Sequence, residues 1–332
     1  MNTINTFSFN ALKAVMVVAL TSVVGCSTSH SSAQRSKSAA KISSVQAPTF
    51  LTLILEPSKE RYVLGEPVYV TVRLKNEGSE PVLGAPNLDP EFGQLNVSVA
   101  GGDHKPFRFV PLGILDSDAP RRNLPAGAEV AEVFPVFYGG RGWTFKALGQ
   151  YTLTATAPVT SKGRPEQAIV RSAAVTITIE AGPTVEPGRL LMEGVQGDEA
   201  GKFLTWNSGD HLRKGTGRML SVMERFPESP LNDYIAFALG KNMSRPFKDY
   251  SIPRLRPPDC STAAVYFKRV RPNSLPSFLQ IQMHLAEARC AAVAKDIEAK
   301  RRALEEARRL IGARLEFQKL LDQVQLIETD KN

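Results

Sequence analysis

The period of the hydrophobic residues changes once along this chain of 332 residues, between Gly182 and Gly188. Before this segment apolar residues alternate with polar ones, which is typical of strands that bury one face. After it they recur at helical spacing, which is typical of amphipathic helices. Each pattern suits only its own kind of secondary structure. We therefore expect a multidomain fold, with an all-β part at residues 49–182 and an all-α part at residues 183–332.

The first part consists of many short alternating segments separated by clusters of Gly, Asn and Ser. In residues 51–55 and 68–75 every second residue is apolar, and the opposite set, which includes Tyr69, is expected to face water. This arrangement favours an antiparallel β-sandwich. Pro135 lies inside the apolar segment Val133–Phe137. That strand is therefore expected to lie at a sheet edge or to carry a bulge.

Two segments of the first part resemble bacterial immunoglobulin-like domains. The run Gly65–Val72 (GEPVYVTV) is similar to their second strand, and Gly149–Leu153 (GQYTL) is similar to their tyrosine corner. The resemblance implies an immunoglobulin-like sandwich in which the hydroxyl of Tyr151 bonds to nearby backbone. Such a fold says little about function, and the sandwich could be only a spacer.

The second part contains a weak internal repeat. Met223–Leu231 and Phe267–Leu275 each combine a helix end, a Pro-x-Ser turn and the start of a new helix, about 45 residues apart. Ser229 and Ser274 are expected to be N-caps. The arrangement resembles tetratricopeptide-type helical hairpins, whose usual repeat is about 34 residues. A generic helical bundle is the alternative.

The end of the chain is expected to form one long charged helix, from about Ala294 to Ile327. Acidic and basic residues four positions apart support it, and one apolar line along it requires a neighbour. Gly312 could let this helix bend.

The N-terminal segment has the features of a secretory signal. Lys13 precedes the apolar run 14–24, which is shorter than the about 20 residues that a membrane-spanning helix needs. The run ends in Val23-Val24-Gly25-Cys26, which resembles the lipobox of bacterial lipoproteins. The resemblance implies that residues 1–25 are removed as a signal peptide and that Cys26 is acylated, so that the lipid bilayer is a partner of this chain. An ordinary cleaved signal with an incidental cysteine is the alternative.

A flexible tether is expected over residues 26–48, because Ser, Ala, Lys and Gln dominate there and too little apolar surface is available for folding. Ser27 follows the cysteine, which in enterobacterial lipoproteins resembles sorting to the outer membrane. We therefore expect this chain in the cell envelope, anchored in the outer membrane and facing the periplasm.

Cys260 and Cys290 are the two cysteines that remain once Cys26 is acylated. In an oxidising compartment they are expected to form a disulfide bond. This bond would close a loop of about 30 residues and stabilise the fold by about 3.5 kcal/mol. Two buried free thiols are the alternative.

Residues 244–259 form a Pro-rich segment that is too long for a simple connector. Its cations and aromatic residues could bind an acidic or polymeric partner. The alternative is a loop packed across the helices and held at Cys260. The candidate partner-binding residues are Arg245, Phe247, Lys248, Tyr250, Arg254 and Arg256.

Charge and composition bear on the remaining classes of function. The net charge is +8, but both signs are mixed and no basic block occurs, so we expect no nucleic-acid partner. None of the four histidines has metal-ligand spacing or an obvious nucleophile beside it. Phosphate loops and HExxH motifs are also absent from the sequence. We therefore expect no catalytic residue, no metal and no cofactor.

The leading hypothesis from the sequence is a membrane-anchored, non-catalytic protein-interaction or scaffold module. One alternative is an envelope protease inhibitor that acts through Val110–Ile114 or the Pro-rich segment. The other is an enzyme of unrecognised type. The identity of the protein partner and the oligomeric state stay open.

Overall fold

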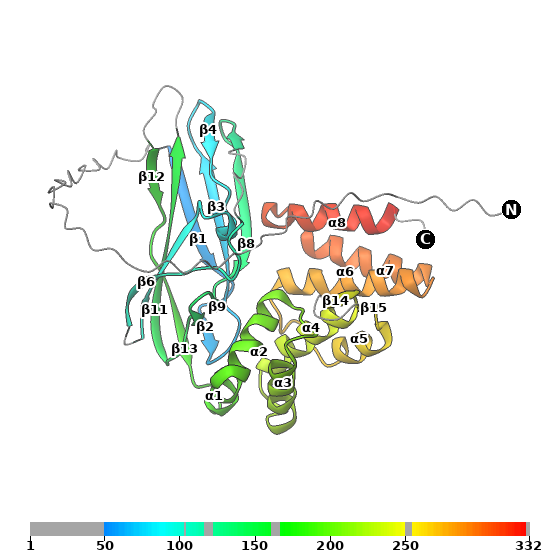
Figure 1. The fold of residues 1–332 in the computed structure, drawn as a ribbon. Helices are drawn as coiled ribbons and strands as arrows, with labels where there is room; N and C mark the ends of the chain where they lie inside the picture. The colour runs from blue at the N-terminus through cyan, green and yellow to red at the C-terminus, as the bar shows by residue number, and fades with distance from the viewer. Residues whose placement is uncertain (1–49, 103, 116–121, 161–166, 250–253, 330–332) are drawn as a thin grey trace, which may run out of the picture. The chain divides into compact units, whose positions relative to one another are not determined.

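A β-rich region followed by a helical region makes up the described part of the chain (Figure 1), as the change in hydrophobic period predicts. The computed structural model describes residues 50–102, 104–115, 122–160, 167–249 and 254–329. Cys26, Tyr250, the predicted signal and the predicted tether lie outside these ranges. The described residues all belong to one compact unit.

Two main sheets form the β region. One has the strand order β1-β3-β8, and the other has the order β2-β13-β11-β5-β6 with β12 also paired to β11. Neighbouring strands are antiparallel except β13 and β2. The smaller pairs are β9 with β10 and β4 with β7. The strands are β1 (Leu51–Pro57), β2 (Arg61–Val63), β3 (Tyr69–Asn76), β4 (Val82–Ala85), β5 (Asn96–Gly101), β6 (His104–Arg108), β7 (Arg122–Leu124), β8 (Glu129–Pro135), β9 (Tyr138–Gly139), β10 (Gly142–Trp143), β11 (Gly149–Thr160), β12 (Gln167–Arg171) and β13 (Val175–Glu180), with a short 3₁₀ helix, η1 (Pro90–Phe92), between β4 and β5.

The alternating pattern correctly predicts the face of β1 and β3 that lies in the core. Leu53, Val70 and Val72 are all buried. Tyr69 differs from the prediction, because it lies on the opposite face and is nevertheless only 3% exposed. Its ring packs 6.0 Å from that of Phe278 in the helical region. The helical region therefore covers part of the face that was expected to face water.

Two local predictions for the β region are confirmed. Pro135 ends β8, which lies at the edge of its sheet. The hydroxyl of Tyr151 donates to the carbonyl oxygen of Ala147 at 3.0 Å and accepts from the same residue's amide at 3.2 Å. This is the contact with nearby backbone that defines a tyrosine corner.

The helical region begins six residues after β13 ends. It consists of α1 (Glu186–Met192), α2 (Gly194–Trp206), α3 (Arg213–Arg225), α4 (Leu231–Met243), the hairpin strands β14 (Phe247–Asp249) and β15 (Arg254–Arg256), α5 (Cys260–Phe267), α6 (Ser277–Val293), α7 (Ile297–Ile311), the 3₁₀ helix η2 (Leu315–Phe317) and α8 (Gln318–Thr329). Among the described residues no helix is both long and apolar enough to cross a bilayer.

The two Pro-x-Ser turns differ from each other. Ser229 is not the N-cap of α4, which corrects the prediction, because Pro230 occupies that position. The hydroxyl of Ser229 accepts from the amide of Leu231, the first residue of α4, at 3.3 Å. Ser274 is not an N-cap, which corrects the prediction, because α6 begins three residues later, at Ser277. Its hydroxyl donates instead to the carbonyl oxygen of Arg271 at 2.7 Å. The sequence repeat is therefore not matched by two equivalent helix starts.

The predicted long C-terminal helix is wrong, because the structure divides it into α7, η2 and α8. Asp296 caps the start of α7 by accepting from the amide of Ala299 at 2.9 Å. Gly312 ends this helix with a φ of 53°, a conformation that glycine adopts without steric penalty. The break allows Phe317 of η2 to pack beside Phe278, with 6.4 Å between the ring centroids.

The break also lets η2 and α8 pack against the β1-β3-β8 sheet. Glu316 pairs with Arg73 of the central strand β3 at 3.0 Å, and Lys319 pairs with Glu132 of β8 at 2.6 Å. These two ion pairs join the C-terminal segment to two strands of the sheet.

Cys260 and Cys290 form a disulfide bond, with 5.3 Å between their Cα atoms. The bond joins the first residue of α5 to the last turn of α6. In the Pro-rich segment before it, β14 and β15 pair as an antiparallel hairpin.

A single hydrophobic cluster joins the β region to the helical region. It includes Leu53 and Val72 of the sheets together with Phe203, Ile235 and Leu279 of the helices. A second, smaller cluster packs α6, α7 and α8 together. The two parts predicted from the change in period therefore share one core.

Candidate functional site

The junction between the two regions begins with an unusually close backbone approach. Gly188 of α1 lies so near the segment after β2 that a Cβ atom at this position would be 2.1 Å from the carbonyl oxygen of Leu64. Gly65, with a φ of +82°, faces Gly188 from the other side of the contact. Only glycine leaves room for this approach. The segment in which the hydrophobic period changes thus ends, at Gly188, in a backbone contact between the two regions.

A buried carboxylate links the β region to α4. The side chain of Glu66 is 4% exposed and pairs with the ammonium of Lys59 at 2.5 Å. It also accepts from the amide of Val63 at 3.0 Å and from the hydroxyl of Tyr234 at 2.9 Å. Burial, and the charge of Glu66, raise the pKa of Tyr234 well above its usual value. The phenol therefore keeps the proton that it donates, and every partner of the buried charge is in place.

A third set of contacts joins β9 and β10 to α2. The indole Nε1 of Trp143 donates to the carbonyl oxygen of Gly197 at 3.1 Å. The ring of Tyr138 lies edge-on to Trp143 at 5.5 Å and packs against Gly201, where a Cβ atom would be 2.2 Å from the ring. These contacts fix the direction of α2 relative to β9 and β10.

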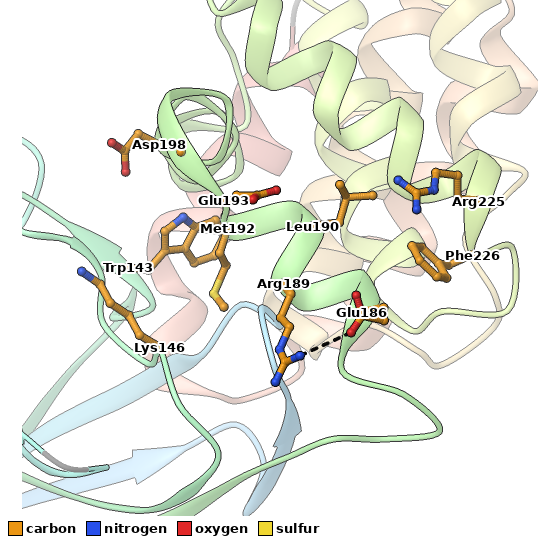
Figure 2. Close-up of a pocket in the computed structure, with 11 residues that line it drawn as sticks. Trp143, Lys146, Glu186, Arg189, Leu190, Met192, Glu193, Asp198, Arg225 and Phe226 are labelled. Atoms are coloured by element: carbon orange, nitrogen blue, oxygen red, sulfur yellow. Dashed lines mark hydrogen bonds and ion pairs between the residues drawn. The ribbon is translucent and has the colours of Figure 1, made fainter.

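A cavity of about 760 Å³ lies at this junction. Figure 2 shows Trp143 and Lys146 on one side of it, Arg225 and Phe226 on the other, and α1 between them. The residues that line it are Trp143, Lys146, Glu186, Arg189, Leu190, Met192, Glu193, Gly194, Asp198, Arg225 and Phe226.

The lining of this junction cavity carries charges of both signs around apolar groups. Its charged residues are Lys146, Arg189, Arg225, Glu186, Glu193 and Asp198. Glu186 and Arg189 pair with each other at 3.4 Å, but both are well exposed, so this pair contributes little to stability. Lys146 and Arg225 have no ion-pair partner among the described residues. Both cations are therefore available to a ligand.

Asp198, which lines the junction cavity, is hydrogen-bonded to Tyr138, which is not among the lining residues. The hydroxyl of Tyr138 donates to Asp198 Oδ1 at 3.5 Å. Burial, and then the charge of Asp198, raise the pKa of Tyr138 to about 12. The phenol thus stays neutral at physiological pH. None of the described residues that line this cavity is a histidine, cysteine, serine or threonine.

The residues predicted to bind a partner lie elsewhere, in and beside the β14–β15 hairpin. Arg245 donates to the carbonyl oxygens of Trp206 and Asn207 at 3.1 and 2.9 Å. Arg256 binds Asp210, with 2.5 Å between Nε and Oδ2. These two cations hold the Pro-rich segment onto α2 and the turn after it. This agrees with the alternative interpretation, a loop packed across the helices.

The other predicted residues of the hairpin are less fully described. Phe247 stacks on His211, with 5.9 Å between the ring centroids. Lys248 is exposed. Of Arg254 only the backbone in β15 is described, and Tyr250 lies outside the described residues. Partner binding by this hairpin stays a prediction.

The junction cavity could not be predicted from the sequence. Its residues come from β10, α1, α2, the end of α3 and the residues beside these elements. Only Arg225 and Phe226 belong to a recognised pattern, the weak repeat at Met223–Leu231, and this repeat indicates no cavity. Trp143, the tryptophan of the β region, is a signal that could have pointed to this junction, because a buried indole needs a hydrogen-bond acceptor.

Comparisons with known proteins leave the function open. No protein-family model and no curated protein matches this chain. The CARDB domain of a Pyrococcus furiosus protein, solved with di-metal ions, is 16% identical and covers 39% of this chain and 87% of its own, with a TM-score of 0.22. A sporulation control protein of Bacillus subtilis is 15% identical over 41% of this chain and 52% of its own, with a TM-score of 0.25.

A β-glucosidase of Listeria innocua, in complex with glucose, is 14% identical over 39% of this chain and only 16% of its own, with a TM-score of 0.22. Among these structural neighbours are CARDB domains, which are immunoglobulin-like. Similarity at these scores supports no argument about activity or ligands.

Proposed function

We propose that this chain is a lipid-anchored protein of the bacterial cell envelope that binds a segment of a partner polypeptide in the junction cavity and catalyses no reaction. The observation that supports it is the lining of this cavity, where acidic and basic side chains surround Trp143, Met192 and Phe226. A polypeptide segment offers charges of both signs together with apolar side chains. A purely anionic or purely apolar ligand would leave half of the lining without a partner.

In this proposal the cellular location is inferred from the sequence Val23-Val24-Gly25-Cys26 and from the composition of residues 26–48. In the same proposal the β region is an immunoglobulin-like module, supported by the tyrosine corner at Tyr151. The helical region combines with it to form the binding surface, in the manner of helical-hairpin interaction domains. The shared core favours a fixed surface over two independently moving modules.

Photo-crosslinking from inside the junction cavity tests the proposed binding. A photoreactive amino acid at Leu190, in intact cells, is expected to give an adduct of discrete mass with one polypeptide. The same probe at Leu326, which is 69% exposed on α8, serves as the control and should give none. Equal labelling from both positions would contradict the proposal.

A charge-reversal variant provides a second test in the crosslinking experiment. Arg225→Glu is expected to lower the yield of the adduct about tenfold, equivalent to about 1.4 kcal/mol of binding energy. Arg302→Glu makes the same change of charge on the exposed side of α7 and should leave the yield unchanged. An adduct that survives Arg225→Glu would exclude this cavity as the binding site.

Cys26→Ser tests the membrane anchor. We expect the variant to move from the membrane fraction to the soluble fraction, because the chain then lacks the acyl groups that hold it. Ser29→Ala, three residues further on, should stay in the membrane fraction. Unchanged fractionation of Cys26→Ser would show that the anchor is not at this residue.

A further inference from the structure

Three cations gather where the C-terminal end of α4 meets α6. Lys241 lies in the last turn of α4, and Arg245 follows one turn later. The ammonium of Lys241 contacts the side-chain oxygen of Gln282 on α6. Arg289 lies seven residues after Gln282, about two turns along the same face of α6. Arg289 in turn donates to the side-chain oxygen of Gln323 at 2.9 Å.

The side-chain acceptors in this cluster carry no charge. Among the described residues no carboxylate lies within ion-pair distance of Lys241, Arg245 or Arg289. Two carboxylates on neighbouring segments have other partners, since Asp210 binds Arg256 and Glu287 binds His284.

The backbone compensates only part of this charge. Arg245 donates to two carbonyl oxygens at the C-terminal end of α2, where the helix dipole is equivalent to about half a negative charge. With Lys241 protonated, the surplus among the three cations is therefore about two and a half positive charges.

The cations also repel one another. Burial, and then the charges of Arg245 and Arg289, lower the pKa of Lys241 to about 7. Burial and the neighbouring Arg289 and Arg256 lower the pKa of Arg245. Like charges that are partly removed from water destabilise a fold unless an anion accompanies them. Arg289 is exposed, so an anion can reach the cluster from solvent.

We propose that Lys241, Arg245 and Arg289 together bind a phosphate group, as free inorganic phosphate or as the headgroup of an anionic phospholipid. A phosphate carries the charge that the surplus requires, and its oxygens match the planar donor array of guanidinium groups. Lys241 adds a point charge at the inner end of the cluster. The phosphate-binding cluster is separate from the junction cavity and does not depend on what that cavity binds.

Thermal unfolding of the full chain in detergent tests this cluster with inorganic phosphate as the probe and chloride at equal ionic strength as the reference. We expect a saturable rise in Tm with phosphate only. Lys241→Met should raise Tm without phosphate, because a repelled cation is gone, and should weaken phosphate binding at least about tenfold. Arg289→Gln provides a second variant at an exposed position and should weaken binding similarly.

Lys214→Gln is the matched control, because it removes one positive charge from an exposed position on α3. It should bind phosphate as the unaltered chain does. Flotation of the Cys26→Ser chain with phosphatidylglycerol or phosphatidylcholine vesicles distinguishes a phospholipid headgroup from free inorganic phosphate as the source of the phosphate group. If lipid supplies the phosphate, only phosphatidylglycerol vesicles carry the chain, and Arg289→Gln loses this binding while Lys214→Gln keeps it. Binding to neither inorganic phosphate nor these vesicles, or binding that Lys241→Met and Arg289→Gln leave unchanged, would overturn the proposal.

Discussion

Gly188→Ala is expected to lower the free energy of unfolding by about 3 kcal/mol, at the upper end of what overpacking usually costs. The added methyl group would lie 2.1 Å from the carbonyl oxygen of Leu64. Since the obstacle is backbone, it cannot be relieved by a change of side-chain rotamer. Either α1 or the segment after β2 must move, and both belong to the junction. Denaturant unfolding, monitored by circular dichroism, measures the loss.

Gly217→Ala is the matched control for this substitution, because it makes the same chemical change inside helix α3. No atom lies within 4 Å of the Cβ position at Gly217. We expect a gain of about 0.5–1 kcal/mol from the higher helix propensity of alanine. The two substitutions should thus have opposite signs. Gly188→Ala should also reduce crosslinking from Leu190, and a fully stable Gly188→Ala variant would contradict the close approach.

Replacing Cys260 and Cys290 together by alanine is expected to lower the free energy of unfolding by about 3.5 kcal/mol. The two cysteines are 30 residues apart, and a crosslink over this distance reduces the entropy of the unfolded chain by the corresponding amount. A reductant should produce the same loss in the unaltered chain and none in the double variant. Equal stability of the oxidised and reduced chain would show that the bond makes no contribution.

The sequence correctly predicted features that depend on residues within one strand or one turn. Alternation predicted the buried face of β1 and β3, Pro135 predicted an edge strand, and the position of Tyr151 predicted its contact with backbone. These features depend on residues that are close in the chain. The disulfide between Cys260 and Cys290 followed from the count of cysteines in an exported protein.

What the sequence could not reveal depends on contacts between the two regions. Alternation predicts which residues share a face of a sheet, but it does not show whether another element packs on that face. The burial of Tyr69 under the helical region could therefore not be predicted. Gly188 marked only the boundary between the two parts, because the sequence alone does not distinguish a glycine required by a close approach from one in a loop. The break at Gly312 was not predicted because the apolar line of the expected helix continues beyond it, at Leu315 and Leu320. The junction cavity depends on all of these contacts, so it could not be predicted.

Native-state hydrogen exchange tests most directly whether the β region and the helical region form one body around a shared core. The best-protected amides of β11 and of α4 are expected to exchange with the same free energy, that of global unfolding, because both elements contribute to one hydrophobic cluster. Gly188→Ala should lower both values together. If the amides of α4 exchanged at a much lower free energy while those of β11 stayed protected, the two regions would be independent domains, and the junction would not be a fixed binding site.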